Sequence, residues 1–136
     1  MDEQFIKTVM DSLGYTREQA EGLSEKQQKI IKGGPARRAY KVVMEVVKAE
    51  TPGCKAKVGD RIVMKGSGVL IPEECTCPLC IWAIAPVLPI HYVIYERLTL
   101  GMDPNDILYD HYKCRGLGLE CGGIGELVFK VHCVKA

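Results

Sequence analysis

Three of the seven cysteines in this 136-residue chain lie within the six-residue segment Cys75-Thr76-Cys77-Pro78-Leu79-Cys80. Cys77 and Cys80 have the two-residue separation at which a pair of thiolates binds one metal centre, as in zinc and iron–sulfur sites. Pro78 suits the first turn of a helix, and the free N–H groups of that turn lower the pKa of neighbouring thiols. Cys75 makes the segment crowded for one tetrahedral ion, although a larger cluster can use it. The segment therefore predicts a soft-metal site at the start of a helix.

The remaining ligands must come from other parts of the chain. Cys54 lies in a turn and Cys114 ends a predicted strand, so a sheet packed on the helix can carry both to its first turn. Cys121, in a glycine-rich segment, is a further candidate. The predicted metal ligands are Cys54, Cys77, Cys80 and Cys114, a four-cysteine set that suits a 4Fe–4S cluster.

The ligand types favour an iron–sulfur cluster as the metal. Only soft ligands are clustered, no histidine stands at zinc-finger spacing, and the glycine-rich backbone nearby can donate N–H groups to sulfur. Zinc is the nearest alternative. The sequence contains no second Cys-x-x-Cys pair, so a protein without metal is a third interpretation. In that case the cysteines are buried apolar residues or a redox pair.

Composition and charge exclude several classes of function. The net charge is +1 and the lysines and arginines are dispersed, so no nucleic-acid surface is expected. The most apolar run, 81–95, is too short to span a bilayer and contains two prolines and a histidine, so no membrane association is expected. The acidic N-terminus does not resemble a signal peptide, and an odd number of cysteines argues against a disulfide framework. We expect a cytoplasmic protein.

The hydrophobic pattern indicates which elements must position these cysteines. Residues 2–33 are expected to form three short helices, because Thr16 and Ser24 are suitable N-caps and Gly14 and Gly33 suitable stops. Alternating residues predict strands over 41–48, 61–65, 107–114 and 127–134. A long helix is predicted over 79–100, kinked by Pro86 and Pro89, apolar all round at its start and therefore buried.

This order of elements predicts an α+β fold, with an antiparallel sheet of about four strands packed on one long, Pro-kinked helix. We expect an N-terminal helical arm over residues 1–35 and an α+β cysteine-containing domain over residues 36–136. The arm has few apolar residues, so we expect it to dock on a protein partner or to mediate self-association. A surface appendage without a partner is the alternative.

A looser pattern links three of the cysteines. Cys54 precedes Val58-Gly59-Asp60, Cys77-Pro78 opens a helix that contains Pro86, and Cys114 ends a strand before the final strand. In this pattern, residues 40–136 resemble a family of small, largely uncharacterised prokaryotic proteins that is frequent in anaerobes. The resemblance brings no established activity with it, and Cys75, Cys80 and Cys121 fall outside the pattern.

Several other residues are expected to have structural rather than chemical roles. His91, within the apolar helix, and Cys133, on the apolar face of the last strand, are expected in the core. Arg37 and Arg38 are expected at a solvated strand edge, with anion binding as the alternative. Alternation along a strand puts Asp110 and His111 on opposite faces, so these two are not expected to pair.

Three functions are compatible with these residues. The first is a small iron–sulfur protein that transfers electrons for, or is an accessory subunit of, a larger anaerobic enzyme. The second is a metal-dependent enzyme that uses an open coordination position on a site with three cysteine ligands. The third is a binding or regulatory module without metal, in which the cysteines are structural. No catalytic residue can be assigned from the sequence.

Overall fold

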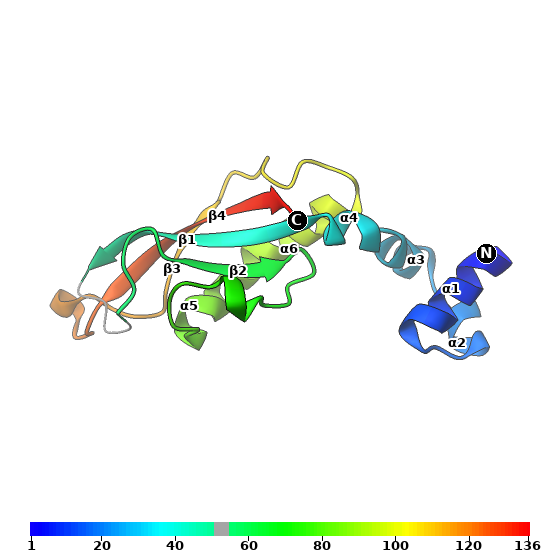
Figure 1. Cartoon of the computed structure of the whole chain (residues 1–136), viewed down its shortest axis with the longest axis horizontal. Coiled ribbons are helices and arrows are strands. Elements are labelled where there is room, and N and C mark those ends of the chain that lie inside the picture. The colour runs from blue at the N-terminus through cyan, green and yellow to red at the C-terminus, as the bar shows by residue number, and fades with distance from the viewer. Residues whose placement is uncertain (51–54) are drawn as a thin grey trace.

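The computed structural model describes residues 1–50 and 55–136, and its centre is a four-stranded antiparallel sheet in the order β2-β1-β4-β3 (Figure 1). The two long strands β1 (Tyr40–Glu50) and β4 (Glu126–Lys135) pair along their full length in the middle. β2 (Arg61–Lys65) and β3 (His111–Lys113) are short edge strands. The α+β fold with a four-stranded antiparallel sheet is thus as the sequence predicted.

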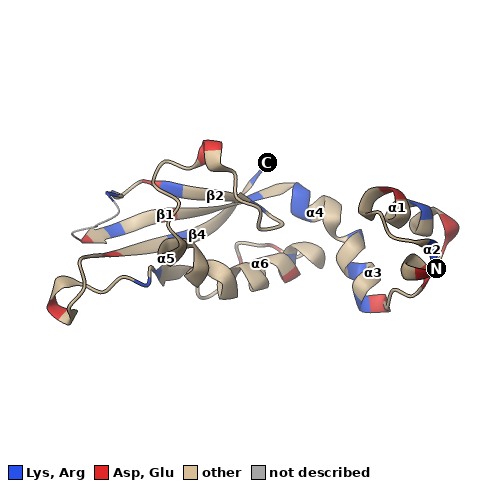
Figure 2. Cartoon of the chain, turned by 90° about the horizontal axis from the view of Figure 1, so that it is seen from below, with Lys and Arg blue, Asp and Glu red and all other residues tan. Residues whose placement is uncertain are grey.

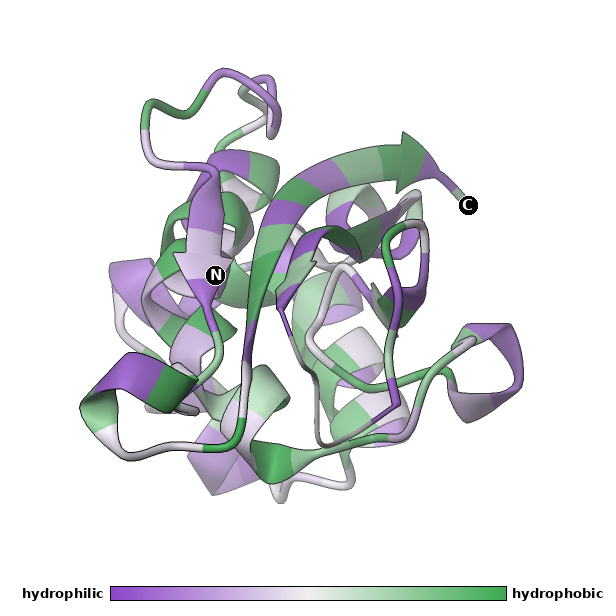
Figure 3. Cartoon of the chain, turned by 90° about the vertical axis from the view of Figure 1, so that its left-hand side faces the viewer, coloured by the Kyte–Doolittle hydropathy of each residue, from purple (hydrophilic) through white to green (hydrophobic). Residues whose placement is uncertain are grey.

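The sheet forms because its central strands alternate apolar and polar residues. Val42, Met44 and Val46 of β1 are fully buried and face the same cluster as Phe129 and Val131 of β4. Figure 3 shows the corresponding bands of hydrophobic and hydrophilic residues along β4, the strand that ends at the C-terminus. One irregularity, between Val46 and Lys48, shifts the register of β1 against β4. Such alternation defines one apolar face that must be covered.

A helical segment over residues 81–99 covers that face. It consists of α5 (Ile81–Ile84), the 3-10 turn η2 (Ala85–Val87) and α6 (Leu88–Thr99), and η2 contains Pro86 while Pro89 lies in the first turn of α6. The predicted kink is therefore a change of helix type, since proline removes a backbone donor. The inward side chains recur at helical spacing: Ala83, Val87, Ile94 and Leu98 join the core of the sheet, and His91 is buried on the same side.

The opposite side of this helical segment is exposed, which corrects the expectation of burial all round. Its large apolar side chains include Trp82 and Tyr92, both more than half exposed. In Figure 2 the coils α5 and α6 carry no charged residue until the last turns of α6. The apolar composition that suggested burial on every side therefore describes two faces, one in the core and one open to solvent.

The N-terminal arm consists of α1 (Glu3–Leu13), α2 (Arg17–Glu21) and α3 (Glu25–Lys32), and Figure 1 shows α1 and α2 away from the sheet. Thr16 and Ser24 form the capping boxes of α2 and α3, as predicted. A second hydrophobic cluster of Ile6, Val9 and Ala20 holds α1 against α2. Among the helices of the described residues, none is long and apolar enough to cross a membrane.

The arm joins the main helix through a fourth short helix that the sequence did not predict, α4 (Gly34–Arg38). Arg37 is buried there, donating 2.7 Å hydrogen bonds to Thr99 Oγ1 and to the carbonyl of Ile30. Its guanidinium lies 4.3 Å from the centre of the Tyr95 ring. The prediction that Arg37 is solvated was therefore wrong: this side chain fastens α3 and α4 to α6.

Candidate functional site

Two hydrogen bonds hold the end of β3 against the start of the main helix. The hydroxyl of Tyr112 donates to the carbonyl of Ala83 at 2.7 Å, and the backbone N–H of Arg115 donates to the carbonyl of Trp82 at 3.0 Å. Cys80 is the residue that immediately precedes α5, and Cys114 follows β3 directly. These contacts therefore bring a helix-start cysteine and a strand-end cysteine into one region of the molecule.

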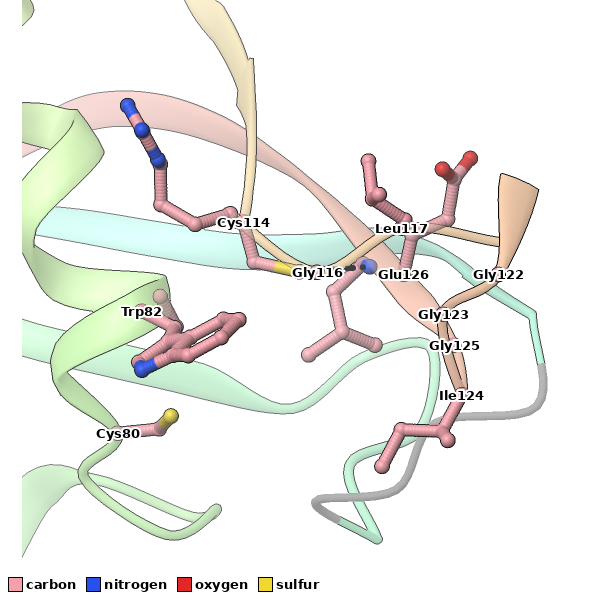
Figure 4. Close-up of a pocket in the computed structure, with 13 residues that line it drawn as sticks. Cys80, Trp82, Cys114, Gly116, Leu117, Gly122, Gly123, Ile124, Gly125 and Glu126 are labelled. Atoms are coloured by element: carbon pink, nitrogen blue, oxygen red, sulfur yellow. Dashed lines mark hydrogen bonds between the residues drawn. The ribbon is translucent and has the colours of Figure 1, made fainter. Parts of the chain in front are cut away.

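Cys80 and Cys114 line the same pocket, which has a volume of about 600 Å³. Trp82, Leu117 and Ile124 supply much of its wall, together with the glycine-rich loop between β3 and β4. In Figure 4 both sulfur atoms face this opening, with the indole of Trp82 between them in the view. Apolar pockets of this size with a few polar groups are typical of ligand sites.

Cys77 stands three residues before Cys80, on the segment that leads into α5. The nearby Tyr112 phenol is buried, and this burial raises its pKa above the ordinary value of 10.0. Cys77 Sγ is 3.9 Å from the carbonyl oxygen of Arg61, at the start of β2. Cys77, Cys80 and Cys114 all pack against the main core cluster.

The backbone around Cys114 favours a sulfur that accepts hydrogen bonds. The N–H of Leu127 donates to Cys114 Sγ at 3.2 Å. A Cβ on Gly116 would approach the carbonyl oxygen of Gly125 to 2.5 Å and this sulfur to 3.3 Å, so only glycine lets the loop close so tightly. N–H donation of this kind orients and stabilises thiolates that bind metals.

The remaining described cysteines have other surroundings. Cys75 Sγ accepts from the N–H of Val63 and donates to the carbonyl of Ile71, both at 3.3 Å, so it belongs to the packing against β2. Cys133 is buried as predicted, and burial raises the pKa of its thiol to about 11. Cys121 is exposed in the turn η3 (Leu119–Cys121). The spacing of the cysteines in the sequence could not show that the surroundings of Cys75 differ from those of Cys77 and Cys80.

The described cysteines do not complete a metal site by themselves. In residues 1–50 and 55–136, no three His, Cys, Asp or Glu side chains form a group placed to hold a metal ion. Cys54, the fourth predicted ligand, lies outside the described residues. The structure thus brings Cys80 and Cys114 to one pocket, whereas Cys77 Sγ lies near the Arg61 carbonyl and the place of Cys54 stays a prediction.

His91 and His111 each have a hydrogen-bond partner in the structure. His91 is buried and its Nε2 lies 3.1 Å from the carbonyl oxygen of Gly66, so it is the core histidine that was predicted. His111 Nδ1 lies 2.7 Å from Asp110 Oδ1, which contradicts the prediction that these residues do not pair. β3 begins only at His111, so the alternation assumed for Asp110 does not apply. The hydrogen bond from His111 lowers the pKa of Asp110.

No protein-family model, curated protein or solved structure matches the chain. The case for a function therefore rests on the thiols and on the pocket beside them.

Proposed function

We propose that this protein is a small iron–sulfur protein, acting as an electron-transfer or accessory subunit of a larger enzyme. The observation that carries the proposal is that Cys80 and Cys114, from distant parts of the sequence, line one pocket, and that Cys77 stands three residues before Cys80. Cys77, Cys80 and Cys114 would hold the cluster, and Cys54 is the fourth ligand predicted from the sequence. When bound, such a cluster takes up and releases single electrons.

The donor set supports a soft metal rather than a hard one. Two thiols, Cys80 and Cys114, line the pocket with one carboxylate, Glu126, and soft thiolates select iron–sulfur clusters, zinc or copper(I). The N–H of Leu127 already donates to Cys114 Sγ, which is the type of contact that tunes cluster potentials. Zinc remains the alternative metal, since it accepts the same ligands.

The N-terminal arm supports the role of a subunit. Its small cluster of Ile6, Val9 and Ala20 holds two helices together, and Leu13 and Ile30 remain exposed on the arm. A helical pair that stands away from the sheet offers a partner protein an accessible apolar surface. We propose the arm as the element that docks on the larger enzyme.

Cluster binding is tested by preparing the full chain without oxygen, with ferrous iron and sulfide, and measuring iron, sulfide, visible absorbance and electron paramagnetic resonance. We expect the wild type to bind iron and sulfide. We expect Cys54→Ser, Cys77→Ser, Cys80→Ser and Cys114→Ser each to lose most of the cluster. Cys75→Ser and Cys121→Ser are the matched controls, and both should keep it. A wild-type chain that takes up neither iron nor sulfide under these conditions would overturn the proposal.

The pocket favours a second candidate, a metal-dependent enzyme with an open coordination position. A volume of about 600 Å³ beside Cys80 and Cys114 leaves space for a substrate next to the metal. In this case the cluster or zinc would act as a Lewis acid on a bound oxygen or sulfur group. A small thiol added to the loaded protein should then change its spectrum, whereas four protein ligands would leave the spectrum unchanged. Retention of fold and partner binding in a metal-free Cys77→Ser, Cys80→Ser double variant would favour the module without metal.

A further inference from the structure

The outward face of the helical segment 81–99 is apolar along most of its length. Ile81, Trp82, Leu88, Tyr92 and Val93 are 66%, 59%, 50%, 67% and 46% exposed, respectively. These positions are one, six, four and one residues apart, which at 3.6 residues per turn places all five on one side of the helix. Ala85 and Pro89, which are also exposed, fill the positions between them. We call these seven residues the outer helix face.

This face lacks the charges that a solvated helix carries. No Asp, Glu, Lys or Arg occurs from Leu79 to Tyr95, and the first charged residue is Glu96. The helix α3, by contrast, has charged residues at half of its positions. Figure 2 shows the same contrast between the tan coils of α5 and α6 and the marked turns of α3. A contiguous apolar face without charge is typical of a protein–protein contact.

The size of the face fits an interface between two copies. An apolar or aromatic side chain of this kind carries roughly 150–250 Å² of surface, so five that are about half exposed present on the order of 500 Å². Two such faces together would bury ~1,000 Å², the lower bound for a specific protein–protein interface. A face without charge meets its own copy without like-charge repulsion, which a two-fold contact requires.

The order of side chains along the face is also self-complementary. We propose that the outer helix face binds the same face of a second copy, antiparallel, about a two-fold axis near the junction of η2 and α6. In this arrangement Trp82 of one copy meets Tyr92 of the other, and Ile81 meets Val93. Ala85 meets Pro89, and these small residues let the two helices approach closely. Leu88 lies beside the axis, where it meets its own counterpart.

Such a dimer would extend the pocket site. Trp82 belongs both to the outer helix face and to the wall of the pocket that contains Cys80 and Cys114. Tyr92 of the second copy would therefore lie against the far side of an indole that faces the thiols. The dimer does not depend on the iron–sulfur cluster, so each proposal can fail without the other.

The test is the mass of the full chain in solution, measured by light scattering and sedimentation over the micromolar range. We expect a dimer for the wild type and a monomer for both Leu88→Glu and Leu88→Lys, because like charges would face each other at the axis. An equimolar mixture of these two variants should recover a heterodimer, since Glu and Lys then meet. Ala85→Arg is a second disrupting variant in case Leu88→Glu does not fold. Leu13→Lys, on the exposed side of α1, is the control and should remain a dimer.

Each other result counts against the proposal. A wild type that stays monomeric, or a Leu88→Glu variant that stays dimeric, would overturn it. A mixture of folded Leu88→Glu and Leu88→Lys that stays monomeric would reject the two-fold contact at Leu88. Loss of the dimer in Leu13→Lys alone would move the contact to the arm. Iron content, measured on the same samples, reports separately on the cluster.

Discussion

The arm helices and the helical segment 81–99 are specified in different ways. The helices α1, α2 and α3 each begin at an N-cap residue whose side chain accepts a hydrogen bond from a backbone N–H of the first turn. These N-cap residues are Asp2, Thr16 and Ser24, respectively. α5, η2 and α6 have no side-chain cap. Local signals define the first set, whereas packing on the sheet holds the second. A helix without local signals therefore depends on the residues that pack against it, and within the described chain nothing packs against one face of 81–99.

The largest expected difference is between substitutions in the two hydrophobic clusters, one under the sheet and one in the arm. Ile94 and Val9 are both fully buried, one in the sheet cluster and one in the arm cluster. We expect Ile94→Ala to lower the free energy of unfolding of the sheet domain by about 2–5 kcal/mol, because it leaves a cavity in a close-packed core. Val9→Ala should loosen α1 and α2 without moving the main transition.

Thermal unfolding and amide hydrogen exchange on both variants measure this contrast. Faster exchange confined to α1 and α2 in Val9→Ala would support independent clusters. If the two substitutions lower one shared transition by similar amounts, the arm and the sheet unfold as a single cooperative unit and the comparison fails.

Arg37 connects the arm helices to the helical segment 81–99, and we expect its substitution to have an intermediate effect on stability. Replacing it with Met removes the hydrogen bonds to Thr99 and to the Ile30 carbonyl while it keeps most of the volume. Hydrogen bonds to a charged group contribute roughly 1.5–3 kcal/mol, so we expect a loss of that order and faster proteolysis within α3. Arg38→Met, at an exposed neighbouring position, is the control and should change neither quantity. Equal effects of both substitutions would remove Arg37 from this role.

The same contrast explains what the sequence could and could not predict. Period-two alternation predicted the inward face of β1, and the capping residues predicted the arm helices, because both signals are local. The third strand was predicted over 107–114 but pairs only from His111 to Lys113. Strand length depends on the partner strand, which the alternation of one segment does not contain. The Asp110–His111 pair was missed for this reason.

The candidate site shows the same limit. The expectation that Cys114 comes to the start of the main helix follows from fold class, and the structure puts Cys114 and Cys80 on one pocket. Cys75 could not be separated from its neighbours by spacing, because its sulfur is held by β2. Apolar composition could not distinguish a core face from an exposed one, since both exclude charge. For this reason the outer helix face could not be predicted from the sequence.

The smallest expected effect concerns His91, on the buried side of α6. Burial lowers the pKa of His91 below its ordinary value of 6.5, although the hydrogen bond with the Gly66 carbonyl acts in the opposite direction. The unfolded chain therefore takes up this proton at a higher pH than the folded protein does. The contribution of the neutral imidazole is complete above about pH 6.5 and is lost as the pH falls below that value.

Urea unfolding of the wild type and His91→Gln between about pH 7.5 and pH 5.5 measures this effect, because a Gln amide can still donate to the Gly66 carbonyl and has no proton to gain. As the pH is lowered, we expect the free energy of unfolding to fall less steeply in the variant than in the wild type. The two slopes should differ by less than ~1.4 kcal/mol per pH unit, which is the most that the uptake of one proton can contribute. His111→Gln is the control, because His111 is exposed whereas His91 is buried. Parallel pH profiles for wild type and His91→Gln would show that His91 takes up its proton equally well in the folded and unfolded states. The buried side of α6 would then be wet, and the contrast between the two faces of the helix would be smaller than the packing implies.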